Sequence, residues 1–244
     1  MKIRIWHIVF FIVALAAFGV ARAPAAAFAP QREGQFTYAR AQGTIWQARF
    51  EQVQLGPYGV DELNWRLSFW GLVQGKAVAD VLFSGGDIEG DAQLLANWDG
   101  DRRIVAPRIS IEGAPIGAGL NLDGTTSGQG VDIFFDAGRC AAAAGTVQSD
   151  VLARNEAALR WGGPPMSGVA TCDGEDAIIV MTGSGSSESV RALVRLHGDG
   201  RAQWRAEISG ARPEVTAVLA AAGFSADPQS GVQAAGGEMR WTPF

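Results

Sequence analysis

Few residues in this chain are of types that could perform chemistry. A serine nucleophile needs a histidine base within hydrogen-bonding reach. Of the two histidines, only His197 lies outside the apolar N-terminal segment. It falls in a predicted hairpin turn, where we expect a solvated side chain rather than a base. No Gly-x-Ser-x-Gly motif occurs, and the glycine-rich run 183–187 lacks the lysine of a phosphate-binding loop. The sequence therefore identifies no catalytic residue and favours a structural or binding protein over an enzyme.

Acidic side chains cluster in glycine-flanked turns, where an aspartate can hydrogen bond its own backbone without being buried. The clusters are Asp87/Glu89/Asp91, Asp99/Asp101 and Asp173/Glu175/Asp176. Residues 97–101 supply the alternating oxygen ligands that begin a calcium loop, but no distal bidentate glutamate follows them. We therefore expect no metal site, and we expect no cofactor.

The two cysteines, Cys140 and Cys172, are candidates for a disulfide. Disulfides persist in oxidising compartments, so the pairing depends on export of the domain. A bridge would stabilise the fold by about 3–4 kcal/mol according to the chain-entropy model. Two buried free thiols are the alternative, whereas metal binding would need companion ligands that the sequence lacks.

The N-terminus indicates export. Lys2 and Arg4 precede an apolar stretch over residues 5–21, which Arg22 ends. As a helix this stretch would span about 25 Å, at the short end of a membrane-crossing segment. A cleaved signal peptide is the alternative, with Ala25-Ala26-Ala27 before Phe28 as the candidate cleavage site. In both cases the flanking cations predict a cytoplasmic N-terminus and an exported remainder. The candidate anchor residues are Ile5, Phe10, Phe11, Leu15 and Ala21.

The sequence divides into a cytoplasmic tip (1–4), a transmembrane anchor (5–21), an Ala/Pro-rich linker (22–39) and an exported domain (40–244). Apolar residues make up 48% of the chain and charged residues 18%, which excludes a disordered protein. Two cysteines are too few for a disulfide scaffold. The net charge of −5 gives no electrostatic footprint for nucleic acid.

Alternation with a period of two dominates the exported domain and predicts strand after strand. Leu63, Trp65, Leu67 and Phe69 share one face of such a run. The clearest hairpin joins residues 190–196 to residues 202–208 through Gly198-Asp199-Gly200. We expect the tryptophans at strand positions, among them Trp65, Trp161 and Trp204, to pack in the core.

The connections are too short for crossover helices, so the sheet must be mainly antiparallel. One segment breaks the pattern, because Pro213 begins an amphipathic run that ends at Gly223 and predicts one helix. A sheet with one wet face must curl to make a core. The expected fold is all-β: a curled, mainly antiparallel sheet of glycine-turned strands with one short C-terminal helix, preceded by an N-terminal transmembrane helix.

Several segments in order resemble the type II secretion system protein N (GspN) family. They are Gly43-Thr44-Ile45-Trp46-Gln47, Leu63-Asn64-Trp65-Arg66-Leu67, Leu72-Val73-Gln74-Gly75, the pair Cys140 and Cys172 with Gly168-Val169-Ala170-Thr171 before the second cysteine, and a late helix followed by Glu238-Met239-Arg240-Trp241. The family is itself similar in pattern to AsmA-like envelope proteins, which carry the same anchor and repeated glycine-turned strands.

The resemblance implies a single-pass protein of the bacterial inner membrane, with its N-terminus in the cytoplasm and its bulk in the periplasm. It implies a non-enzymatic role in the export of folded proteins across the outer membrane, with other secretion-system subunits as partners and no catalytic residues. The alternative is an AsmA-like envelope protein whose apolar β groove binds or transfers lipid. Either strand at the edge of the sheet could pair with a partner chain.

Overall fold

The computed structural model describes residues 19, 22–29, 31, 36–116, 120–155, 161–185, 188–211, 213–221, 223–226 and 232–240. Its strands are β1 (Phe36–Thr37), β2 (Arg40–Thr44), β3 (Gln47–Leu55), β4 (Tyr58–Leu67), β5 (Lys76–Gly86), β6 (Ile88–Asn97), β7 (Arg102–Ile116), β8 (Leu120–Asp136), β9 (Arg139–Ser149), β10 (Met166–Asp173), β11 (Asp176–Ser184), β12 (Ser189–Leu196), β13 (Arg201–Ser209), β14 (Ser225–Ala226) and β15 (Gln233–Arg240). Its helices are α2 (Ala25–Phe28), α3 (Phe69–Val73), α4 (Val151–Arg154) and α6 (Pro213–Ala221).

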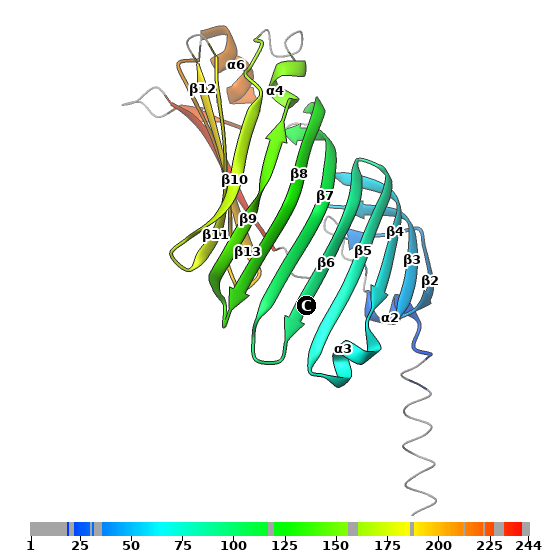
Figure 1. Cartoon of the computed structure of the whole chain (residues 1–244). Coiled ribbons are helices and arrows are strands. Elements are labelled where there is room, and N and C mark those ends of the chain that lie inside the picture. Colours follow the sequence, from blue (N-terminus) through cyan, green and yellow to red (C-terminus); the bar gives the residue numbers. More distant parts are fainter. Residues whose placement is uncertain are drawn as a thin grey trace, which may run out of the picture.

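The strands form one antiparallel sheet in which neighbours in space are almost always neighbours in sequence. The order is β1-β3-β4-β5-β6-β7-β8-β9-β10-β11-β12-β13-β15-β14, and β2 pairs with β3. Figure 1 shows this ribbon of strands curling around itself rather than lying flat. The predicted all-β, mainly antiparallel fold is confirmed.

Because the strands run up and down in sequence, the sheet has two ends. The α3 end carries α2, α3 and the turns 98–101, 137–138, 174–175 and 197–200, and the α6 end carries α4 and α6 (Figure 1). The predicted C-terminal helix is α6, with Val215 and Leu219 buried. The prediction of a single helix was wrong, because short turns of helix also form at α2, α3 and α4. These segments are too short to show a helical period in the sequence.

Three clusters of buried side chains lie along the curl. The first joins α2 to β3–β6, and includes Phe50, Val53 and Val81. The second closes the α6 end, where Trp161 packs with Val215 and Leu219 of α6. The third joins Ile133 and Phe135 of β8 to Ala177 of β11. Since β9 and β10 separate β8 from β11 in the sheet, this last contact requires the sheet to fold over on itself.

Part of the segment expected as a linker packs against the sheet. Ala25 of α2 is buried, and the rings of Phe36 and Tyr38 contact Phe50 at centroid distances of 5.9 and 5.2 Å. The Ile45 amide also donates to the Ala23 carbonyl at 3.1 Å. Alanine-rich sequence fits this position because small side chains allow close approach to the strands. The boundary of the exported domain remains a prediction.

Candidate interaction surfaces

One face of the sheet is largely apolar. The strand register aligns Trp65 with Val81, Leu94 with Ile104, and Val194 with Trp204. We call this surface the inward face, because the buried clusters that it contains are enclosed by the curl. Ile179, Val194 and Trp204 lie on the inward face but belong to none of the three clusters, although each is at least partly buried.

The curl is closed at the α3 end by contacts between distant turns. The Arg102 guanidinium at the start of β7 donates through Nη1 to the Gly198 carbonyl at 2.8 Å. Gly198 itself lies so close to the β8–β9 turn that a Cβ there would clash with the Gly138 carbonyl oxygen. Any side chain at position 198 would therefore force these two turns apart.

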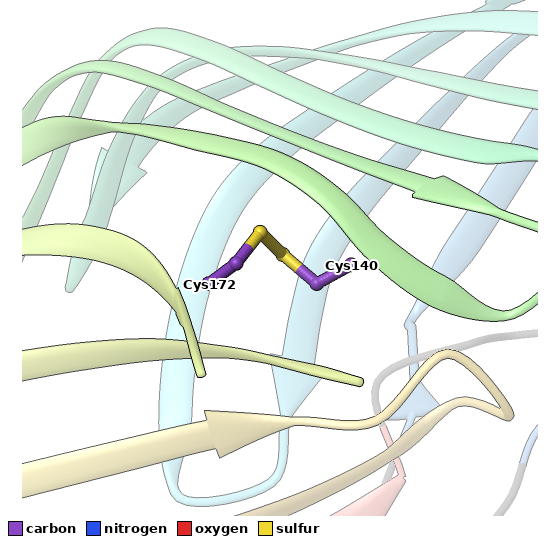
Figure 2. Close-up of a disulfide and its surroundings, with 2 residues drawn as sticks. All are labelled: Cys140 and Cys172. Carbon is purple, nitrogen blue, oxygen red and sulfur yellow. A yellow bond between two sulfur atoms is a disulfide. The ribbon is translucent and has the colours of Figure 1, made fainter. Parts of the chain in front are cut away.

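The disulfide expected between Cys140 and Cys172 is present, with the two Cα atoms 5.6 Å apart (Figure 2). The disulfide joins β9 and β10 where the two strands have no backbone pairing. The β9–β10 ladder covers only Thr146–Ser149 against Met166–Val169. Beyond that point the strands are joined by the disulfide, while the Cys140 amide donates to the Glu175 carbonyl at 2.8 Å. The bridge thus holds the curl where the ladder ends.

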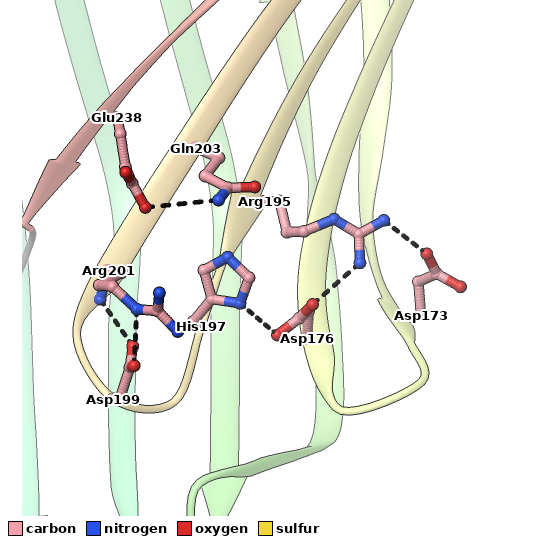
Figure 3. Close-up of polar contacts among 8 residues, drawn as sticks. All are labelled: Asp173, Asp176, Arg195, His197, Asp199, Arg201, Gln203 and Glu238. Carbon is pink, nitrogen blue, oxygen red and sulfur yellow. Dashed lines mark hydrogen bonds and ion pairs between the residues drawn. The ribbon is translucent and has the colours of Figure 1, made fainter.

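Beside the disulfide, charged side chains from two turns form a network (Figure 3). Arg195 of β12 donates through Nη1 to Asp176 at 2.9 Å and through Nη2 to Asp173 at 2.8 Å. Hydrogen bonds to these two carboxylates raise the pKa of the Arg195 guanidinium above its ordinary value. Asp173 and Asp176 therefore bind across strands to an arginine, rather than to their own turn as expected.

His197 joins the same network, and the expectation of a solvated turn residue was wrong. Its side chain is 19% exposed, and Nδ1 lies 2.7 Å from an Asp176 carboxylate oxygen. A catalytic base would need a nucleophile bonded to Nε2, but this atom has no hydrogen-bond partner in the described part of the chain. The arrangement links the turns of β10–β11 and β12–β13. Sequence reasoning missed it because the residues come together only through strand register.

At the α6 end, one carboxylate connects β8 to α4. The Asp150 side chain accepts from the Thr125 amide at 2.7 Å and from the Arg154 guanidinium at 2.6 Å. These hydrogen bonds, the backbone one foremost, lower the pKa of Asp150 below its ordinary value. The neighbouring Asn155 adds a second link, since its side chain bonds both the amide and the carbonyl of Asp123.

The two edges of the sheet differ. At the first edge, β1 and β2 together cover most of β3. At the last edge, β14 pairs with only Gln233 and Ala234 of β15. Within the described residues no strand pairs with the remainder of β15 on its outer side, so residues 235–240 present an open edge.

The candidate anchor residues Ile5, Phe10, Phe11, Leu15 and Ala21 lie outside the described residues. Among the residues that are described, no helix has the length and apolar character needed to cross a bilayer. The same residues contain no group of three or more histidine, cysteine, aspartate or glutamate side chains placed to hold a metal ion.

A comparison with models of protein families gives a match. The family model for Type II secretion system (T2SS), protein N, matches residues 35–235, which span the sheet from before β1 into β15. No curated protein matches the chain, and no solved structure matches it. Because the family match extends over most of the chain, this protein belongs to the type II secretion system protein N family.

Proposed function

We propose that this protein is a non-enzymatic component of the type II secretion machinery, anchored in the inner membrane and acting in the periplasm. In this role it contacts other subunits during the export of folded proteins across the outer membrane. The family match over residues 35–235 carries the proposal. The sequence of the N-terminal segment and the disulfide support placement of the sheet in an oxidising compartment.

The test is deletion of the gene in a strain that secretes enzymes by this route. We expect the exported enzymes to disappear from the medium and accumulate in the periplasm, and expression of the full chain to restore secretion. Unchanged secretion in the deletion strain would contradict the proposal. Fractionation of the same cells, with carbonate extraction of the membranes, tests the anchor separately.

We further propose that the open edge of β15 is where a partner subunit adds a strand. Unpaired backbone amides and carbonyls on an edge strand bind an extended segment through main-chain hydrogen bonds. Glu238 lies on this edge and is exposed. A photo-cross-linking amino acid at position 238 should capture a secretion subunit in cells. The matched control is Glu89, an exposed position on the central strand β6. Equal capture at both positions, or at neither, would contradict edge docking.

Lipid binding is the second candidate function. Its support is the inward face of β11–β13, where Ile179, Val194 and Trp204 are partly buried outside the packed clusters. The purified full chain can be incubated with a photoactivatable phospholipid, and the labelled residues mapped by mass spectrometry. Labelling of β11–β13 would support a lipid site. Labelling confined to the segment 5–21 would refute it.

A further inference from the structure

The helix α3 is apolar in sequence, yet none of its residues is buried. Trp70 is 71% exposed and Trp98, on the adjacent β6–β7 turn, is 80% exposed. Phe69 and Val73 are also more than half exposed. We call these four side chains the aromatic patch. Elsewhere in the described residues, the large apolar side chains that are exposed, Leu82 and Val169, each stand alone on a strand. A contiguous exposed apolar patch is characteristic of a binding surface.

Hydrogen bonds hold the two turns that carry the aromatic patch. The Ser68 side chain caps α3 by accepting from the Gly71 amide at 3.1 Å. Gly75, with φ of +79°, turns the chain into β5, and its carbonyl accepts from the Trp98 amide at 3.2 Å. This last bond ties the Trp98 turn to α3. The aromatic side chains are therefore presented by a fixed frame.

The aromatic patch lies next to the point where the chain enters the sheet. Ring contacts run from Trp70 through Phe69 to Trp46, with centroid distances of 5.6 and 5.3 Å. Ile45, the residue before Trp46, donates its amide to the Ala23 carbonyl. Ala23 follows the apolar segment 5–21 by only two positions. A membrane crossed by that segment would thus lie against the α3 end of the sheet.

We propose that the aromatic patch inserts into the interface of the phospholipid bilayer that the segment 5–21 crosses, which fixes the sheet against the membrane. This inference rests on the proposed membrane anchoring. Tryptophan favours the headgroup region because its ring is apolar while its N–H remains hydrated. Lys76 is the one charged side chain between positions 67 and 79. In Figure 1 the acidic β10–β11 turn lies on the opposite side of the α3 end from α3, whereas the β12–β13 turn meets the start of β7 through the bond from Arg102 to the Gly198 carbonyl.

The experiment uses the full chain reconstituted in vesicles of phosphatidylethanolamine and phosphatidylglycerol. A fluorophore is attached to Gln74→Cys, beside the aromatic patch, and quenched by lipids that carry a nitroxide near the headgroup. Matched labels are placed at Glu175→Cys, also at the α3 end, and at Pro57→Cys, at the α6 end; all three positions are exposed. We expect several-fold stronger quenching at position 74 than at the other two. Asp99 adjoins Trp98, and its negative charge is not attracted to the anionic phosphatidylglycerol. Binding therefore depends on apolar insertion, which salt does not screen, and the quenching should persist in high salt.

The double variant Trp70→Ser/Trp98→Ser should abolish the difference between positions 74 and 57. The control Leu82→Ser removes an exposed apolar side chain elsewhere and should leave that difference unchanged. Equal quenching at 74 and 57 in the unaltered chain would overturn the proposal, as would capture of a protein subunit by a cross-linker at position 98 without quenching at position 74. Release of the chain by carbonate would refute the anchor alone. In that case the released full chain is mixed with the same vesicles. Stronger quenching at position 74 than at position 57 then supports insertion of the aromatic patch, and equal quenching overturns it.

Discussion

The two halves of the curled sheet are stabilised by different means. In the first half, β1–β6 surround one hydrophobic cluster, and the rings of Phe36, Tyr38 and Phe50 pack edge to face within it. In the second half, β8–β13 form smaller clusters, supplemented by the disulfide and the network around Arg195. Where the β9–β10 ladder stops, the disulfide and the ion pairs of Arg195 add to the burial of Phe135 and Ala177. The second half thus has covalent and charged links at the place where backbone pairing between two adjacent strands stops.

The largest expected effect comes from removing one large core side chain from each half. Phe50→Ala in the first half and Phe135→Ala in the second should each lower the free energy of unfolding by about 3–5 kcal/mol. Urea titration followed by tryptophan fluorescence measures the loss. Phe134→Ala, at the only partly buried neighbouring position in β8, is the control and should cost clearly less. Equal losses for Phe134→Ala and Phe135→Ala would show that the inward face is not the core.

Loss of the disulfide should have the next largest effect on stability, and it should destabilise the second half of the sheet more than the first. Replacing Cys140 and Cys172 together by serine should reduce stability by about 3–4 kcal/mol, given the sequence separation of 32. Hydrogen exchange should then increase in β9–β12 while β3–β6 keep their protection. An increase of the same size in both halves would mean that the sheet unfolds as a single unit. The two halves would then not differ in how they are stabilised.

Acid should act mainly on the second half. Asp132, Asp150 and Asp199 have pKa values lowered by hydrogen bonds, and all three lie in or between β8 and β13. A carboxyl with a lowered folded pKa stabilises the fold above its unfolded value of 3.8, and this contribution is lost as pH falls through the folded value. Hydrogen exchange at successive pH values should show β8–β13 opening before β3–β6.

Asp150→Asn provides the matched variant for this acid effect. It keeps the side-chain shape while weakening the bonds to the Thr125 amide and Arg154, at a cost of about 1 kcal/mol near neutral pH. The variant should therefore show a smaller loss of stability on acidification than the unaltered chain. An identical pH dependence in both proteins would exclude Asp150 as a source of the acid sensitivity.

The sequence predicts the strands well because alternation reports directly on which face is buried. It also predicts the helix at Pro213, where a proline start and a glycine stop coincide with a helical period. Phe50 and Val53 are both buried although they lie three positions apart, because Gln52 adopts a positive φ of 51°. The alternation of buried and exposed positions therefore shifts by one residue at Gln52, and a glutamine gives no sign of such a shift in the sequence.

The surfaces were harder to predict. The network of Asp176, Arg195 and His197 depends on strand register and on the curl, neither of which a sequence pattern specifies. The sequence predicts that the tryptophans at strand positions pack in the core. Trp161 is buried although it lies outside the strands, whereas Trp65 and Trp204 are only partly buried. Trp70 and Trp98 are instead among the most exposed side chains described. Hydrophobicity alone does not distinguish a core aromatic from one on a binding surface, because the difference lies in what surrounds it.

The strand order has a consequence for how the protein is made. Nearly every strand pairs with the one before it in the chain, so each new strand finds its partner already formed. Short loops between partners keep the entropy of closure low and favour rapid folding. If the chain crosses the membrane from its N-terminus, as proposed, its sheet can assemble strand by strand during translocation. Cys140 and Cys172 would meet as soon as β10 arrives, before the last strands have crossed.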